Sequence, residues 1–205
     1  MFNSRLGLGV EISPKNKNNI SPFFNQSITG HFGCVNALEF SNGNEKLLAS
    51  AGDDKRVLLW RTSDILFKKK NDLKRFAQMT GGHDSNVFCL AFSSDNARLY
   101  SAGNDRQILW HDVSNRSTMD VWNAPDAVYS VSVCPEKDTQ FIVSTENGNV
   151  LYFDALVSDP EAAIVVAKDR AAYQSAAFNP INPLIVASAN PKQGLQLWDI
   201  RKPKT

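Results

Sequence analysis

Four times along this chain of 205 residues, a short apolar run ends on an aromatic or histidine side chain at the same place in a repeating unit. Trp60, His111, Phe153 and Trp198 occupy that place, at spacings of 51, 42 and 45 residues. Recurrence on this scale marks a repeat protein and constrains the fold before any single residue is considered. A residue type that returns in each unit is first expected to hold that unit together.

Each unit consists of short apolar runs separated by turn residues. The first runs are Val35–Phe40, Val87–Phe92, Val128–Val133 and Tyr173–Phe178. The second runs are Leu47–Ala51, Leu99–Ala102, Phe141–Ser144 and Leu184–Ala189. The third runs are Arg56–Trp60, Gln107–Asp112, Asn149–Asp154 and Leu195–Asp199, and weaker fourth runs lie near Phe76–Met79, Met119–Trp122 and Ile164–Lys168. Regularly spaced short strands predict an all-β chain, and no segment keeps a helical apolar period over three turns. Four antiparallel strands per unit, repeated radially, describe a β-propeller.

The signature residues of these units resemble the WD-repeat family. Gly30–His31, Asp54 and Trp60 match its Gly–His opening, its turn aspartate and its closing tryptophan. Trp198–Asp199 repeats the close in the fourth unit. The second unit departs because His111 takes the tryptophan position, and the third and fourth units lack the Gly–His pair. The resemblance covers nearly the whole chain and implies a WD-repeat β-propeller.

The repeats also divide the chain. Residues 1–22 are rich in Asn and Lys without a strand pattern, and we expect a flexible leader there. Residues 23–205 are expected to form the propeller, with an outer strand at 23–29 and units at about 30–80, 82–122, 124–168 and 170–201. Family members commonly have about seven blades, so we expect four units to be part of a larger propeller that continues beyond Thr205, in a truncated chain or an incomplete gene model. A four-bladed ring closed by the strand at 23–29 is the alternative. Open edges at the break predict a poorly soluble or oligomeric chain.

Composition excludes several function classes. A net charge of +1 gives no drive toward nucleic acid, and no apolar run reaches membrane-spanning length. Cys34, Cys89 and Cys134 form no close pairs and lie at or within first strands, so buried free thiols in a reducing compartment are the simplest interpretation. We therefore expect an intracellular protein, nuclear and/or cytoplasmic, with no metal, no cofactor, no membrane contact and no direct nucleic-acid contact. The basic residues between Thr62 and Arg75 are interpreted as a solvated loop.

Histidine, serine and aspartate recur in the units in a way that resembles catalytic chemistry. The residues concerned are His31, Ser50, Asp54 and Trp60 in the first unit, and His83, Ser101 and Asp105 in the second. In WD-repeat proteins these positions form a buried hydrogen-bond chain, and a scaffold requires such repetition whereas a catalytic site does not. No phosphate loop, metal-ligand cluster or nucleophile elbow accompanies them, so we predict no catalytic residues and no enzyme activity.

The close of the fourth unit, Trp198–Asp199–Ile200–Arg201, carries the most specific local motif. It resembles the motif shared by substrate receptors of cullin-4 RING ubiquitin ligases, in which the arginine contacts the propeller adaptor of the ligase, damage-specific DNA-binding protein one. That resemblance implies adaptor contacts at Trp198, Asp199 and Arg201. The alternative is that Arg201 only pairs with Asp199. The third unit ends Phe153–Asp154–Ala155–Leu156 and has no such arginine.

Longer stretches resemble one subgroup of these receptors, the cullin-4-associated factor five type. They include Gly30–Asn42, Gly52–Trp60, Ser85–Phe92 and Gly194–Pro203. The resemblance implies a non-catalytic protein-binding scaffold that recruits client proteins for ubiquitination. A WD-repeat scaffold of another complex, for example a chromatin-associated one, is the alternative.

One column of residues is the candidate client-binding site. Asn36, Phe88, Tyr129 and Gln174 each lie four residues before the end of a first strand, at a place expected to face one end of the central channel. Phe88 and Tyr129 are natural anchors for a peptide because aromatic side chains dominate the energetics of protein interfaces. Packing within the blades is the equally weighted alternative.

Overall fold

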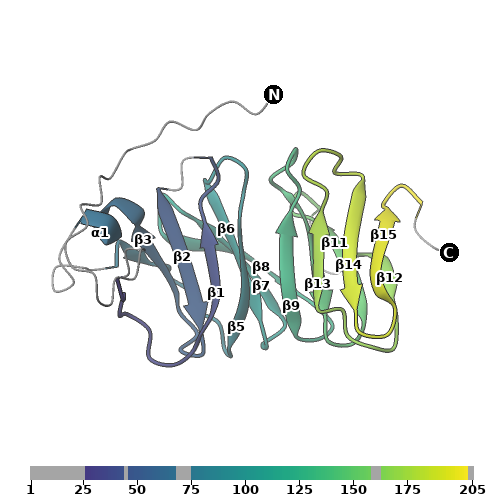
Figure 1. The fold of residues 1–205 in the computed structure, drawn as a ribbon, viewed down its shortest axis with the longest axis horizontal. Coiled ribbons are helices and arrows are strands. Elements are labelled where there is room, and N and C mark those ends of the chain that lie inside the picture. The colour runs from purple at the N-terminus through teal and green to yellow at the C-terminus, as the bar shows by residue number, and fades with distance from the viewer. Residues whose placement is uncertain (1–25, 44–45, 68–74, 158–162, 203–205) are drawn as a thin grey trace, which may run out of the picture.

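The computed structural model describes residues 26–43, 46–67, 75–157 and 163–202. Within them, strands β1 to β15 form four antiparallel sheets, and one short helix, α1 (Thr62–Phe67), follows the third strand. The sheets stand side by side in chain order, from the purple first sheet to the yellow fourth sheet (Figure 1). In this described part of the chain, no helix is long and apolar enough to cross a membrane.

The strands follow the predicted repeat. The first sheet contains β1 (Val35–Phe40), β2 (Leu47–Gly52), β3 (Val57–Arg61) and β4 (Ala77–Gln78). The second contains β5 (Val87–Phe92), β6 (Arg98–Gly103), β7 (Gln107–Asp112) and β8 (Ser117–Asn123). The third contains β9 (Val128–Val133), β10 (Gln140–Thr145), β11 (Asn149–Asp154) and β12 (Ile164–Lys168). The fourth contains β13 (Ser175–Phe178), β14 (Ile185–Asn190) and β15 (Gly194–Asp199).

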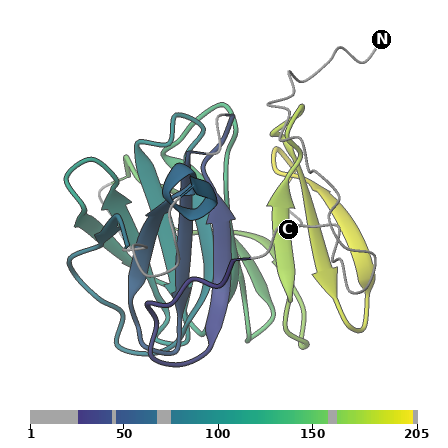
Figure 2. The same cartoon turned by 60° about the vertical axis from the view of Figure 1, so that its left-hand side comes forward.

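All four sheets share one topology. Each strand pairs with the next strand in sequence, so every sheet is a meander of hairpins with its first strand at one edge. The first strands of consecutive sheets, β1, β5, β9 and β13, are neighbours in space. The two views agree that the sheets follow one another along an open arc, with the first and fourth sheets at its ends (Figure 1 and Figure 2). This is an arrangement of propeller blades, and the predicted all-β fold of four units is confirmed.

The core lies between the sheets, where one apolar cluster joins each sheet to the next. The second and third sheets meet through an aromatic group around the fully buried Phe141, whose ring centroid lies 4.9 Å from that of Tyr100, 5.1 Å from Phe153 and 5.4 Å from Trp122. Such pairs contribute about 0.5–1.5 kcal/mol each beyond the burial of their area. The blades are therefore held by their neighbours as much as by their own hydrogen bonds.

Two expectations differ from the structure. Gln26–Thr29, the described part of the expected outer strand at 23–29, forms no strand, and the fourth sheet has only three strands. The segment instead leads to Gly30, whose carbonyl oxygen accepts a hydrogen bond of 2.6 Å from Arg56 of the first sheet. The expectation of three buried thiols is also wrong, because Cys34 precedes β1 and is exposed, whereas Cys134 is buried and Cys89 half-buried. The expected leader at 1–22 and most of the basic loop lie outside the described residues.

Candidate functional site

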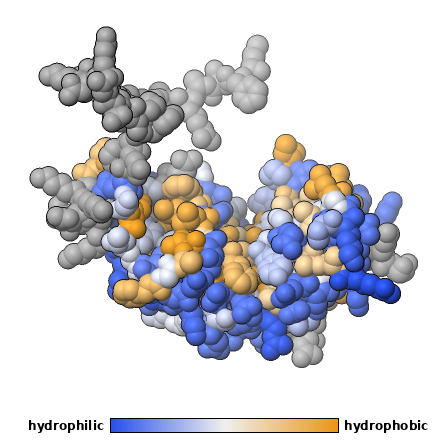
Figure 3. Space-filling view, turned by 60° about the horizontal axis from the view of Figure 1, so that its bottom comes forward, coloured by the Kyte–Doolittle hydropathy of each residue, from blue (hydrophilic) through white to orange (hydrophobic). Residues whose placement is uncertain are grey.

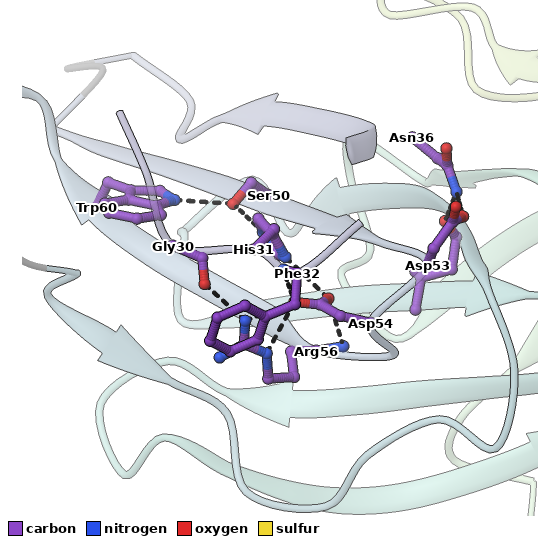
Figure 4. Close-up of polar contacts among 10 residues, drawn as sticks. Gly30, His31, Phe32, Asn36, Ser50, Asp53, Asp54, Arg56 and Trp60 are labelled. Atoms are coloured by element: carbon purple, nitrogen blue, oxygen red, sulfur yellow. Dashed lines mark hydrogen bonds and ion pairs between the residues drawn. The ribbon is translucent and has the colours of Figure 1, made fainter. Parts of the chain in front are cut away.

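A chain of hydrogen bonds crosses the first sheet (Figure 4). His31 Nδ1 lies 2.9 Å from Asp54 Oδ1, and His31 Nε2 lies 2.8 Å from Ser50 Oγ. The Trp60 indole donates its Nε1–H to the same Ser50 oxygen at 2.8 Å. The structure thus brings together the four residues that the sequence analysis groups in the first unit.

The chemistry of these groups assigns the direction of each bond. Since the Trp60 indole can only donate, Ser50 accepts from it and donates its own hydrogen to His31 Nε2. His31 then carries its ring proton on Nδ1 and donates it to the Asp54 carboxylate, an assignment that follows from the network. Every member has a partner, so the chain stiffens the sheet without leaving a buried group unsatisfied.

The Asp54 carboxylate is the charged end of this chain. Burial raises its pKa, but hydrogen bonds from the backbone N–H of Phe32, from His31 and from Arg56 outweigh that effect and hold the pKa well below its usual range. The Arg56 guanidinium also lies over the Phe32 ring, 4.6 Å from its centroid. The turn therefore clamps the loop that precedes β1, and Asp54 stays ionised at neutral pH.

The second sheet repeats the chain with histidine in the tryptophan position. His83 Nδ1 lies 2.9 Å from Asp105 Oδ2, and His83 Nε2 lies 2.8 Å from Ser101 Oγ. His111 Nε2 contacts Ser101 Oγ at 2.7 Å, and His111 Nδ1 lies 3.0 Å from Thr118 Oγ1. His111 is fully buried, and burial, with a smaller effect of nearby His83, lowers its pKa to about 3. His111 is therefore neutral and takes the place of the indole beside Ser101.

Trp110, one residue before this histidine, does not substitute for the missing indole. Because successive strand residues point to opposite faces, its ring lies on the other side of β7. There its Nε1 is buried without a hydrogen-bond partner among the described residues, and the Arg98 guanidinium lies 5.1 Å from its ring centroid.

The third and fourth sheets keep only parts of the network. In the third, Phe153 fills the aromatic position and the nearby Ser144 Oγ bonds to Ser130 Oγ at 2.8 Å. In the fourth, the Trp198 indole donates to Ser188 Oγ at 2.8 Å, as its counterpart does in the first sheet. In the first, second and fourth sheets, a serine on the second strand thus bonds to the tryptophan or histidine side chain on the third strand.

The end of β15 carries an exposed arginine in a defined geometry. Arg201 Nε lies 2.8 Å from Asp199 Oδ1, and Arg201 Nη2 lies 2.6 Å from Asp199 Oδ2. The backbone N–H of Arg201 bonds to the same carboxylate at 3.1 Å. The arginine side chain is 60% exposed, so this forked pair leaves part of the guanidinium open to solvent. Hydrogen bonding from Arg201 lowers the pKa of Asp199 to about 2.

An apolar cleft opens beside this pair, between the third and fourth sheets. Its volume is about 260 Å³, and Asp199, Arg201 and Lys202 line it together with apolar side chains from both sheets. The apolar members are Tyr152, Ile164, Val166, Leu184, Trp198 and Ile200. A protein surface that binds Arg201 can therefore also place an apolar group in this cleft.

The four residues of the candidate client column lie where the first strands begin, which is the opposite end of the strands from Arg201. Phe88 and Tyr129 are partly exposed neighbours, with ring centroids 6.0 Å apart at an interplanar angle of 55°. The exposed Asn36 donates to Asp53 Oδ1 at 2.8 Å and to the Val87 carbonyl at 3.3 Å, so it is tied to the second sheet.

Gln174 is also exposed, just before β13, and its backbone N–H bonds to the Ala189 carbonyl at 2.9 Å. The structure therefore brings Phe88 and Tyr129 into contact and leaves Asn36 and Gln174 on either side of them in the order of the sheets. The end of the sheets where the first strands begin comes forward in Figure 3, which shows apolar side chains among polar ones on both sides of a hollow.

A family model described as "WD domain, G-beta repeat" matches residues 23–61 and 74–112. The chain belongs to the WD-repeat family. It is 43% identical over 76% of its length to human "DDB1- and CUL4-associated factor 5", of which it covers 16%. It is 32% identical over 63% of its length to the fission yeast "WD repeat protein iqw1", also covering 16%. It is 28% identical over 78% of its length to Xenopus laevis "Methylosome protein WDR77", covering 47%. The chain thus spans less than half of each of these relatives.

Membership of the WD-repeat family identifies the histidine–serine–aspartate chains as the internal bracing of a non-catalytic scaffold. Their serine hydroxyls are consumed by the network, since Ser50 and Ser101 each contact two ring nitrogens. Within the described residues, no group of three or more His, Cys, Asp or Glu side chains is placed to hold a metal ion.

Several hydrogen bonds that join one WD repeat to the next are not predicted by the sequence pattern. The backbone N–H of Asn42 bonds to Asn96 Oδ1 at 2.6 Å, and Asn96 Nδ2 donates to the Asn42 carbonyl at 3.0 Å. Between the third and fourth repeats, Ser130 Oγ accepts the N–H of Ala176 at 2.8 Å. These partners lie 46 to 54 residues apart, so no local pattern points to them.

Proposed function

We propose that this chain is a substrate receptor of a cullin-4 RING ubiquitin ligase, binding the propeller adaptor of the ligase through Trp198, Asp199 and Arg201. The observation that carries the proposal is the exposed Arg201 held in a fork by Asp199 at the end of a WD repeat. The similarity to human "DDB1- and CUL4-associated factor 5" supports it, because the name of that protein states the same association.

The geometry of the pair suits an interface. Arginine presents several directed donors from one rigid plane and is enriched among residues that dominate binding energy. Asp199 remains ionised at neutral pH because its pKa is about 2, so Arg201 is oriented before it meets a partner. Less side-chain entropy is then lost on binding. Trp198 contributes by lining the neighbouring cleft and by fixing the end of β15 through Ser188.

The proposed receptor performs no bond chemistry. Clients bind at the end of the sheets that carries Phe88 and Tyr129, flanked by Asn36 and Gln174. Strands β13 and β15 run in the same direction. The end of the sheets where the first strands begin is therefore opposite the end where Arg201 follows β15. A client and the ligase adaptor can therefore be bound at once, which raises the local concentration of acceptor lysines near the ubiquitin-charged enzyme. Such a role places the protein inside the cell, in the nucleus, the cytoplasm or both.

Adaptor binding is tested by titrating the purified adaptor onto immobilised wild-type chain, Arg201→Ala, and Arg170→Ala as a matched control. Arg170 is an exposed arginine that precedes β13, at the other edge of the fourth sheet. We expect the dissociation constant to rise on the order of 10- to 100-fold in Arg201→Ala and to stay unchanged in the control. Equal binding by all three proteins would refute the assignment of the contact.

Client binding is tested separately by capturing cellular proteins with wild type and with the double variant Phe88→Ser and Tyr129→Ser. Clients that require the aromatic pair are expected to disappear from the variant while the adaptor remains. If the same proteins are captured by both baits, the pair serves only to pack the second and third sheets against each other.

A scaffold of another complex is the second candidate. The similarity to Xenopus laevis "Methylosome protein WDR77" over 78% of this chain favours it, since that protein is named for a different assembly. Mass spectrometry of proteins captured by the wild-type chain separates the two candidates. Cullin-4 and its adaptor support the first, whereas other assemblies without them support the second.

A further inference from the structure

A groove with basic and aromatic walls lies where the first and second sheets meet. It is found at the upper end of the sheets in Figure 1, where the third strands stop and α1 follows β3. Its volume is about 440 Å³, and its lining includes Lys46, Arg61 and Phe76 from the first sheet and the turn of Asp95 and Asn96 from the second. The groove shares no residue with the cleft beside Arg201 or with the histidine–serine–aspartate chains.

The Phe76 ring carries two guanidinium groups. Arg61 Cζ lies over the ring at 4.0 Å from its centroid, and Arg116 Cζ lies over the same ring at 4.9 Å. A cation is attracted to the face of an aromatic ring, so Phe76 holds both side chains in place. A stacked guanidinium keeps its N–H donors directed outward along its edge, which is the geometry that receives a carboxylate.

The backbone around all three residues is fixed. Phe76 donates its N–H to the Leu59 carbonyl at 2.7 Å, and the Arg116 carbonyl accepts the Thr80 N–H at 2.9 Å. Arg61 is the last residue of β3. The two arginines are therefore positioned before a ligand arrives, and less entropy is lost when one binds.

Neither guanidinium has a carboxylate partner among the described residues. The carboxylates on the neighbouring turns bind other groups. Asp95 accepts hydrogen bonds from Ser93 Oγ at 2.6 Å and from the Ala97 N–H at 2.9 Å. Asp112 accepts the N–H of Asn115 at 2.7 Å and its side-chain amide at 3.1 Å. The two like charges on one ring therefore repel each other, and an anionic ligand would offset that repulsion.

Positive charge is concentrated at this end of the first two sheets, although the net charge of the whole chain is only +1. In the described parts of these turns the basic side chains outnumber the acidic ones, with Lys46, Arg61, Arg75, Arg98 and Arg116 against Asp64, Asp95 and Asp112. The hydroxyl groups of Thr62 and Ser63 line the same groove and can bond to a peptide backbone. The groove is thus complementary to a negatively charged polypeptide.

We propose that this groove binds an acidic segment of a partner protein, with one carboxylate in contact with each guanidinium. Clusters of arginine suit the recognition of acidic motifs because each guanidinium makes directed, charge-assisted hydrogen bonds. A polypeptide fits the site better than a nucleic acid does. Single-stranded nucleic acid stacks its bases on aromatic side chains, and Phe76 is already stacked with guanidinium groups.

This site is independent of the proposed ligase contact. Arg61 and Arg116 belong to the first two sheets, whereas Arg201 follows the last strand of the fourth sheet. Arg201→Ala is expected to retain the binding of an acidic peptide. A failure of peptide binding at Phe76 leaves the adaptor contact untouched, so the two proposals can fail separately.

The test is fluorescence anisotropy of a labelled hexaglutamate peptide, titrated with the wild-type chain and with the double variant Arg61→Gln and Arg116→Gln. We expect the dissociation constant to rise on the order of 10-fold or more in the double variant, because the charge-assisted hydrogen bonds are lost. Arg170→Gln is the matched control, since it removes an exposed arginine at the end of the sheets where the first strands begin, and it should bind as wild type does. Labelled hexaglutamine should bind to none of these proteins.

A second double variant, Arg61→Lys and Arg116→Lys, separates a positioned site from general charge attraction. It keeps both charges and removes the planar guanidinium groups, so we expect the dissociation constant to rise on the order of 3-fold. Both arginines are exposed, and circular dichroism checks that each variant keeps the wild-type fold.

Three results would overturn the proposal. Hexaglutamate could bind equally well to wild type and to the glutamine double variant, as when other basic residues hold it. The lysine double variant could bind as tightly as wild type, which would show attraction by net charge alone. A single-stranded DNA of equal charge could bind more tightly than hexaglutamate and lose that binding in the glutamine double variant, which would assign the site to nucleic acid.

Discussion

Lowering the pH from 7 to 5 is expected to cost the folded chain about 2 kcal/mol through His111 alone. Burial, assisted by nearby His83, lowers the pKa of this histidine to about 3 in the fold, while the ordinary value of about 6.5 applies to the unfolded chain. Below pH 6.5 the unfolded chain therefore binds a proton that the folded chain cannot bind. The free energy of unfolding then falls by about 1.4 kcal/mol per pH unit, and the loss ends near pH 3.

The assay is urea denaturation of wild type and His111→Phe at pH 7 and pH 5. Phenylalanine fills the corresponding position of the third sheet as Phe153, so the variant keeps an aromatic side chain while it removes the titrating group and its hydrogen bonds to Ser101 and Thr118. We expect wild type to lose about 2 kcal/mol more than the variant over this range. An equal loss in both proteins would refute the conclusion that His111 is neutral in the fold.

Further predictions concern the glycines of the two Gly–His pairs and the cysteine thiols. Gly30→Ala is expected to destabilise the chain by about 1–3 kcal/mol, because a Cβ there would lie 2.5 Å from Trp60 Cη2. The equivalent Gly82→Ala should change the thermal midpoint little, since the nearest atom to a Cβ there would be the Lys55 carbonyl oxygen at 3.7 Å. Iodoacetamide at pH 8 should modify exposed Cys34 in the native chain and spare Cys89, whose pKa burial raises to about 12; equal labelling in a mass spectrum would contradict this.

Much of the fold follows from local sequence. Period-two apolar runs bounded by turn residues predict the strands, and their recurrence predicts four similar sheets. The same local signals fail at 23–29, because a short, partly apolar run does not specify which sheet it joins. The hydrogen bond from Arg56 to the Gly30 carbonyl holds the end of this segment against the first sheet, and neither residue by itself predicts that contact.

The candidate site also has features that local sequence predicts and features that require the folded chain. The motif from Trp198 to Arg201 can be recognised from sequence because its residues lie within four positions of one another. The fork between Arg201 and Asp199 and the exposure of the guanidinium belong to the folded end of β15. The contact between Phe88 and Tyr129 also requires the fold, because it joins the first strands of two sheets.

The sequence by itself determined the repeat, the strand pattern and the residues that brace the first two WD repeats, since these depend on spacing within a unit. Only the tertiary structure decided how units meet, because contacts between sheets join residues 46 to 54 positions apart along the chain. It thereby decided that Phe92 of the second sheet is buried, whereas Phe40 of the first sheet and Leu197 of the fourth sheet are exposed. Their apolar side chains resemble those of buried neighbours in sequence, and only position in the arc separates the exposed ones from the buried ones.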